Sequence, residues 1–152
     1  MGLTIGDQAP DFTLPSQQNE FISLKNYRGT NIILYFYPKD NTPGCTQEAC
    51  DFRDHFALFN QKNTVIFGIS KDNPIKHQKF IEKYTLPFTL LADVNGDVCE
   101  KYGVINKKSL FGNTFLGIER STFLINEAGI IQTIWRKVKV KNHINEVLHA
   151  LN

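Results

Sequence analysis

NIILYFYPKDNTPGC, residues 31–45, predicts a buried strand that leads directly into a helix. Residues 32–37 are an unbroken apolar run rich in β-branched and aromatic side chains, which is typical of a strand covered on both faces. Thr42-Pro43 predicts a helix start, because the residue before a proline avoids the α region and proline suits the first helical position. We therefore expect Thr42 to cap a helix that carries Cys45 in its first turn.

Strand and helix patterns alternate along the rest of the chain. Four apolar residues at three- and four-residue steps predict one helix running to about residue 60: Ala49, Phe52, Phe56 and Phe59. We expect strands over 64–70, 88–91, 121–125 and 130–135. Further helices are expected from residue 74, over 94–102 and around 144–151. Residues 12–14 and 21–23 are expected to form the two strands of a hairpin. The pattern predicts an α/β, thioredoxin-like fold, in which helices flank a mixed central β-sheet preceded by an N-terminal β-hairpin.

Length and charge narrow the function classes. The chain has 152 residues, 41% of them hydrophobic, which predicts a single domain over 1–152. Its 17 basic and 15 acidic residues give a net charge of +2, so we expect neither nucleic acid nor a membrane as partner. The longest apolar run, 32–37, is far too short to span a bilayer, and the N-terminus lacks a signal pattern. We expect a cytoplasmic protein.

Cys45 is the residue whose position in the sequence most clearly favours chemical reactivity. Unpaired N–H groups and the helix dipole favour negative charge in the first turn of a helix, and the thiolate is the nucleophilic form of cysteine. The position also follows the carboxyl end of a central strand, where open α/β sheets place their ligand sites. Gly44 has no side chain to block access. The alternative is that Cys45 is a small buried hydrophobic residue.

Pro38-Lys39-Asp40-Asn41-Thr42-Pro43-Gly44-Cys45 resembles the peroxidatic-cysteine signature of the peroxiredoxins, in which Pro, Thr and Cys recur at this spacing. The lead-in Phe36-Tyr37-Pro38-Lys39 and the later Cys50 resemble the Q-type branch, the bacterioferritin comigratory proteins. The similarity extends from residues 6–12 to the terminal helix. It implies an antioxidant peroxidase that reduces hydrogen peroxide and organic hydroperoxides through a Cys45 sulfenic acid.

The resemblance also implies a substrate site. In this family a threonine hydroxyl, the backbone N–H of the reactive cysteine and an arginine hold the peroxide, which corresponds here to Thr42, Cys45 and Arg120. Pro38, Pro43 and Gly44 complete the predicted substrate site. Aimed donors and a fixed cation would stabilise the negative charge that develops when the O–O bond breaks. From spacing alone, a surface or edge-strand arginine is the favoured interpretation of Arg120, and the resemblance reverses that preference.

Cys50 is the predicted resolving cysteine, which would condense with the sulfenic acid to form a disulfide. Five helical residues separate the two Cα atoms by about 8.6 Å, beyond the roughly 7 Å that a disulfide allows, so the helix would have to open. The resemblance implies regeneration by thioredoxin or a related dithiol, and we expect a monomer. Cys50 could instead pack within the helix, and packing is the role predicted for Cys99.

Two other function classes remain open at this stage. A thioredoxin-type disulfide exchanger would carry a Cys-x-x-Cys motif, and the three cysteines lack that spacing. A metal-binding module would need ligand-like spacing between cysteines and histidines. The four histidines do not have that spacing to the cysteines: His55, His77, His143 and His149. We therefore expect neither a metal nor a cofactor. Residues 105–117 lack periodicity and are predicted to be a loop, either an ordinary surface loop or one that borders the peroxide site or the reductant's docking surface.

Overall fold

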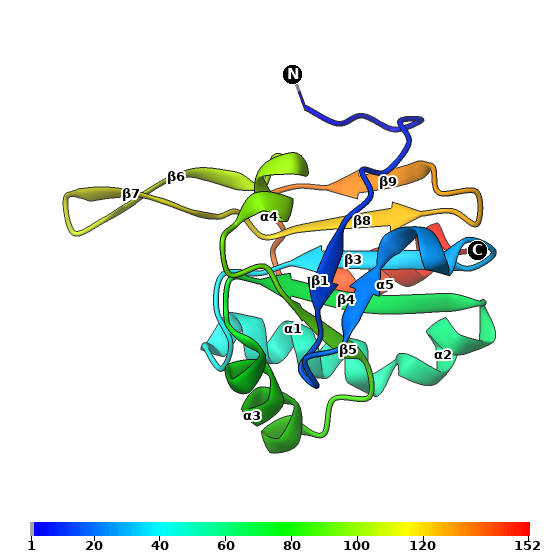
Figure 1. Ribbon diagram of the computed structural model, residues 1–152, viewed down its shortest axis with the longest axis horizontal. Helices are drawn as coiled ribbons and strands as arrows, with labels where there is room; N and C mark the ends of the chain where they lie inside the picture. The colour runs from blue at the N-terminus through cyan, green and yellow to red at the C-terminus, as the bar shows by residue number, and fades with distance from the viewer. Residues whose placement is uncertain (1) are drawn as a thin grey trace.

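The computed structural model describes residues 2–152 and is organised around a five-stranded sheet of order β5-β4-β3-β8-β9 (Figure 1). Its central strand is β3, which pairs in parallel with β4 and antiparallel with β8. The bounds are β3 Asn31–Phe36, β4 Thr64–Ser70, β5 Thr89–Ala92, β8 Ser121–Ile125 and β9 Ile131–Trp135. The predicted mixed sheet is therefore confirmed, with its central strand where the sequence placed it.

Helices cover both faces of this sheet. Side chains of β3 alternate between two buried clusters, so that Leu34 and Phe36 face one layer while Ile33 and Tyr35 face the other. One layer contains α1, α3 and α5, and the other contains α4 and the N-terminal segment. The helices are α1 Pro43–Asp54, α2 Phe56–Gln61, α3 Pro74–Tyr84, α4 Asp97–Lys101 and α5 His143–Ala150, with a short 3₁₀ helix, η1, over Leu24–Tyr27. Among residues 2–152, none of these helices could cross a membrane.

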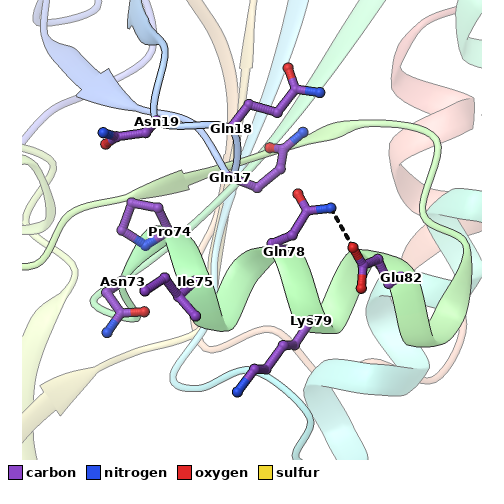
Figure 2. A pocket seen from close by; sticks show the side chains of 9 residues that line it. All are labelled: Gln17, Gln18, Asn19, Asn73, Pro74, Ile75, Gln78, Lys79 and Glu82. Atoms are coloured by element: carbon purple, nitrogen blue, oxygen red, sulfur yellow. Dashed lines mark hydrogen bonds between the residues drawn. The ribbon is translucent and has the colours of Figure 1, made fainter.

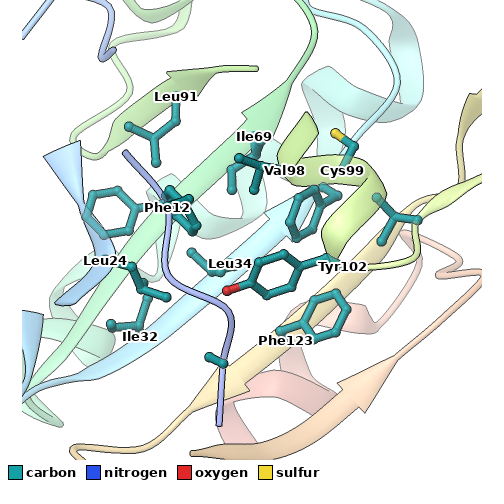
Figure 3. Packing of buried hydrophobic residues seen from close by; sticks show 14 of the residues in the cluster. Phe12, Leu24, Ile32, Leu34, Ile69, Leu91, Val98, Cys99, Tyr102 and Phe123 are labelled. Atoms are coloured by element: carbon teal, nitrogen blue, oxygen red, sulfur yellow. The ribbon is translucent and has the colours of Figure 1, made fainter. Parts of the chain in front are cut away.

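The layer around α4 buries Cys99. Figure 3 shows Cys99 beside Val98 and Tyr102, above Leu34 and Phe123 of the sheet. Burial, together with a hydrogen bond to Asp93, raises the pKa of the Cys99 thiol and keeps it protonated. The predicted packing role of Cys99 is therefore confirmed.

The helix predicted to continue to residue 60 is interrupted at His55. Helix α1 ends at Asp54, and α2 begins at Phe56. The ring of His55 hydrogen-bonds the carbonyl of Asp51 at 2.8 Å, and its ψ of 9° departs from helical geometry. This side-chain bond satisfies a carbonyl at the end of α1 and lets the chain turn so that Phe59 packs in the core.

Residues 105–117 were predicted to be a loop, and this prediction was wrong. They form most of a hairpin of β6 (Ile105–Leu110) and β7 (Asn113–Ile118) that extends beyond the sheet (Figure 1). Its turn, Phe111-Gly112, has positive φ at both residues, as tight hairpin turns require. Most of its side chains are exposed on both faces, so the sequence has no apolar–polar alternation that would reveal strands.

The predicted N-terminal hairpin is confirmed as β1 (Thr13–Pro15) and β2 (Phe21–Ser23). A surface cavity of about 840 Å³ lies between its turn and α3 (Figure 2). Asn73 lines this cavity and caps α3 by accepting a hydrogen bond from the N–H of Lys76. The residues that line the cavity include none of the predicted site residues, so the functional site lies elsewhere.

Candidate active site

Cys45 is the third residue of α1 and lies just past the end of β3, as predicted. Its side chain is buried, with 2% of the residue exposed. Thr42 is the N-cap, with extended backbone geometry, and its carbonyl accepts the first helical hydrogen bond, from the N–H of Thr46. The Thr42 hydroxyl donates to the carbonyl of Lys39 at 2.9 Å, so its side chain stabilises the preceding turn.

Arg120 contacts the sulfur of Cys45. Its Nη2 donates to Cys45 Sγ at 3.4 Å, and only 16% of its side chain is exposed. The antiparallel pairing of β3 with β8 explains this proximity, because Phe36 lies opposite Ser121 and the residue before Ser121 therefore reaches the end of β3. The sheet register thus brings together two residues that are 75 positions apart.

Gly44 leaves room for this arginine. A Cβ atom built on Gly44 would lie 3.2 Å from Nη2 of Arg120, tighter than an ordinary contact. Gly44 itself is exposed, as expected for a residue that permits access to Cys45. Pro43 is the first residue of α1, and Pro38 opens the turn between β3 and α1. Pro38, Pro43 and Gly44 therefore all belong to one turn and the helix start that follows it.

Glu48 is a site residue that the sequence analysis missed. Its Oε1 accepts a hydrogen bond from Nη1 of Arg120 at 2.7 Å, and its side chain is 2% exposed. Burial raises the pKa of Glu48 to about 7, and this effect outweighs the opposing attraction of Arg120. Within residues 2–152, Oε2 finds no hydrogen-bond partner. A glutamate on the same apolar helix face as Cys45, Ala49 and Phe52 was the signal that could have revealed it.

Lys108 of β6 is a second residue that was missed, because the hairpin itself was not predicted. Burial, followed by the charge of Arg120, lowers the pKa of Lys108, while the charge of Cys45 raises it. Its stem passes close to Gly117 in β7, where an added Cβ would lie 3.1 Å from the Lys108 Cδ. The hairpin therefore contributes a second cationic group, beside Arg120, to the surroundings of Cys45.

Cys50 lies in the same continuous helix as Cys45 and is partly exposed, and both thiols are free. At five helical residues apart, their Cα atoms are separated by about 8.6 Å in ideal geometry. The remaining arginines have structural partners: Arg28 bonds the carbonyl of Ala128, Arg53 that of Tyr84, and Arg136 that of Gly103. These contacts leave Arg120 as the arginine of the site.

The sequence matches known proteins over nearly its whole length. The AhpC/TSA family model matches residues 5–134. A putative peroxiredoxin Bcp of Coxiella burnetii is 52% identical over 99% of this chain and 100% of its own length. The peroxiredoxin Bcp of Bacillus subtilis is 50% identical over 99% of this chain and 96% of its own length.

Solved structures agree with this assignment. The bacterioferritin comigratory protein of Xanthomonas campestris, studied for alkyl peroxide reduction, superposes with a TM-score of 0.90 at 37% identity, covering 98% of this chain and 95% of that one. A mutant of PrxQ from Xylella fastidiosa gives 0.94 at 35% identity, covering 99% and 96%. These matches confirm the thioredoxin-like fold. The chain therefore belongs to the AhpC/TSA family, in its Q-type or Bcp branch of peroxiredoxins, and is a thiol peroxidase that uses a peroxide substrate and a thiol reductant.

Proposed function

We propose that Cys45 is the peroxidatic nucleophile of this peroxidase. The observation that carries the proposal is the 3.4 Å contact between Arg120 Nη2 and Cys45 Sγ in the first turn of α1. The Cys45 thiolate attacks one peroxide oxygen, an S–O bond forms and the O–O bond breaks. Cys45 is oxidised to the sulfenic acid, and the departing oxygen takes up a proton to leave as water or an alcohol.

Arg120 and Thr42 hold the peroxide during this step. Arg120 keeps its charge at any working pH, and its guanidinium has enough N–H groups to bond Glu48, the sulfur and a peroxide oxygen. The N–H of Cys45 supplies a further donor at the helix start. The Thr42 hydroxyl, whose proton bonds the Lys39 carbonyl, can accept a hydrogen bond from the peroxide O–H. Pro38, Pro43 and Gly44 border the site and keep access to the sulfur open.

The substrates are hydrogen peroxide and organic hydroperoxides. The alkyl peroxide reduction studied in the Xanthomonas campestris relative supports the organic class. The exposed apolar side chains of the hairpin also favour it, because Phe115 pairs directly with Lys108, whose pKa responds to the charges of Arg120 and Cys45. An apolar substituent on the peroxide would find contact surface there.

Cys50 resolves the sulfenic acid. Its thiol attacks the Cys45 sulfur, a disulfide forms and the hydroxyl leaves as water. The first turns of α1 must open for this step, because the distance in an intact helix is too large. Thioredoxin or a related dithiol then reduces the disulfide and is itself oxidised. We place the enzyme in the cytoplasm as a single-domain monomer, where such carriers keep thiols reduced.

A thioredoxin-coupled peroxide assay tests these roles. Cys45→Ser should abolish turnover. Cys50→Ser should retain the first oxidation of Cys45 but fail to turn over with thioredoxin, whereas Cys99→Ser, a matched control in the core, should keep wild-type turnover. Full activity of Cys45→Ser would overturn the proposal for the nucleophile, and thioredoxin-linked turnover of Cys50→Ser would overturn the proposal for the resolving cysteine.

A further inference from the structure

The turn between β3 and α1 is attached to α3 through a buried pair, Asp40 and His77. His77 Nδ1 lies 2.7 Å from Asp40 Oδ2, and the two side chains are 0% and 6% exposed. The other carboxylate oxygen of Asp40 accepts a hydrogen bond from the hydroxyl of Tyr37 at 2.5 Å. The second ring nitrogen of His77, Nε2, lies 3.0 Å from the carbonyl of Leu91 in β5. This chain of contacts joins β3, the turn, α3 and β5.

These contacts require a proton between Asp40 and His77. The carbonyl of Leu91 can only accept, so Nε2 of His77 must carry a hydrogen. Nδ1 then faces a carboxyl oxygen at hydrogen-bond distance, which is favourable only if a proton lies between the two atoms. The pair is therefore either an imidazolium with a carboxylate or a neutral imidazole with a carboxylic acid. Without that proton, a lone pair would face a buried carboxylate.

Further contacts fix the same turn. The backbone N–H of Asp40 donates to Asp72 Oδ2 at 2.8 Å. Asn41 has a left-handed φ of 62°, and its Oδ1 accepts from Lys83 and from the hydroxyl of Tyr84, both on α3. The next residue, Thr42, bonds back to Lys39. Asp40 and Asn41 are thus anchored to α3 and to the loop before it, and the helix that carries Cys45 begins two residues after Asn41.

A metal ion is a poorer explanation for this cluster. Asp40, Asp72 and His77 offer ligand atoms within 4.8 Å of one another. The Asp72 oxygen that accepts from Asp40 also accepts from Ser70, and both His77 nitrogens are engaged. The adjoining cavity of about 260 Å³ is lined by four cationic side chains, which would repel a metal cation: Lys39, Lys76, Lys79 and Lys83.

We infer that His77 is a positioning residue, which acts through Asp40 to hold the turn in the form that presents Thr42 and Cys45 to peroxide. The inference rests on the proposed role of Cys45. Two neighbouring segments then behave differently during the catalytic cycle. The turn that ends at Asn41 keeps its conformation, while α1, which follows it, opens. Loss of the hydrogen bond between Asp40 and His77 should loosen the turn and slow the oxidation of Cys45 without slowing disulfide formation. The charged and titratable groups around the pair are Tyr37, Asp72 and the four lysines of the cavity.

Two substitutions of Asp40 distinguish the effect of the shared proton from the effect of the hydrogen bond. Asp40→Ala removes both, and it should slow the first oxidation of Cys45 about tenfold and increase hydrogen exchange at residues 40–46. In Asp40→Asn, the amide can donate to Nδ1 of a neutral His77 and accept from Tyr37, so the contacts survive without the proton. This variant should oxidise at close to the wild-type rate at pH 7.

Stopped-flow oxidation by hydrogen peroxide and amide exchange are the measurements, with the exposed His149→Ala as the matched control for His77→Ala. His77→Ala should resemble Asp40→Ala, and His149→Ala should resemble wild type. The inference is overturned if Asp40→Ala oxidises as fast as wild type, or if Asp40→Asn oxidises about tenfold more slowly than wild type. The second comparison holds even if the alanine variants do not fold. Failure of the proposed function would appear separately, as peroxidase activity in Cys45→Ser.

Discussion

Arg120 uses different nitrogens of its guanidinium to bond the sulfur of Cys45 and the carboxylate of Glu48. One nitrogen donates to each, and the partly buried position limits screening by water. A lysine at this position would keep the charge but lose the fork that reaches both partners. The orientation of the cation, and not its charge alone, is therefore what this arrangement provides.

Arg120→Lys should slow the oxidation of Cys45 by about 100-fold, the usual effect of losing one well-aimed donor. Stopped-flow kinetics with hydrogen peroxide would measure the rate. Arg136→Lys is the matched control, because Arg136 bonds backbone carbonyls away from Cys45 and its replacement should leave the rate unchanged. A lysine variant at position 120 that is as fast as wild type would contradict the role of the guanidinium.

Glu48 should make the stability of the protein depend on pH. Burial raises its pKa from 4.5 to about 7, so the unfolded chain releases this proton at a lower pH than the folded protein. The stability that the protonated form contributes is complete below about pH 4.5 and is lost as the pH rises through about 7. The free energy of unfolding of Glu48→Gln should therefore increase, relative to wild type, between pH 5 and pH 8. Urea unfolding at both pH values measures this difference, and an unchanged difference would refute it.

At the scale of the element, α1 has two requirements that conflict. Its intact first turn places Cys45 beside Arg120, but the same helix keeps Cys50 too far away for a disulfide. Local opening is the physical solution, because part of a protein can unfold at a lower free-energy cost than the whole. The anchored turn before Thr42 then defines where opening begins.

Oxidation should therefore unfold the start of α1. In the protein bearing the Cys45–Cys50 disulfide, amides from Pro43 to Phe52 should exchange faster than in the reduced protein, while those of β3 stay protected. Hydrogen exchange read by mass spectrometry tests this, with Cys50→Ser treated identically as the control that forms no such disulfide. Full protection of this segment in the disulfide form would rule out the opening of α1.

Which elements could be predicted depended on how much of each is buried. The apolar run of β3 and the proline signals before α1 and α3 gave correct positions, because burial and backbone sterics are visible in local sequence. The β6–β7 hairpin was missed because its pairing is stabilised by backbone contacts between largely exposed residues. The break at His55 depends on one side-chain bond, which periodicity does not reveal.

Some site residues could be predicted from local sequence and others could not. Cys45 and Thr42 follow from the helix start, whereas Arg120 required the family resemblance because its position depends on the register of β8 with β3. Glu48 was missed, since a charged residue normally indicates an exposed position, and Lys108 was missed together with its hairpin. The burial of Glu48 becomes visible only when the sheet brings Arg120 to α1.

At the scale of the whole molecule, the sheet separates two cores, and close packing between strands is part of its stability. Gly68 in β4 illustrates this, because an added Cβ would lie 2.7 Å from Leu90 Cδ2 and 2.8 Å from the Tyr35 ring. Both neighbours are buried, so neither can move freely. The glycine therefore sets the distance between neighbouring side chains at the centre of the sheet.

Gly68→Ala should destabilise the protein by about 1–3 kcal/mol, the usual cost of overpacking a core. Urea unfolding at neutral pH would measure this. Gly2→Ala is the matched control, because its Cβ would meet only one atom, at an ordinary 3.9 Å. Equal stability of the Gly68 variant and wild type would show that the sheet relaxes around the extra atom.

The proposed chemistry depends on the sulfur atom of Cys45. The direct test is to identify which cysteine receives the first oxygen atom from peroxide. Cys50→Ser protein is treated with one equivalent of hydrogen peroxide, and its cysteines are mapped by mass spectrometry. One added oxygen is expected on Cys45 and none on Cys99, whose thiol is buried and protonated. Oxygen found on Cys99, with Cys45 unmodified, would show that Cys45 is not the nucleophile.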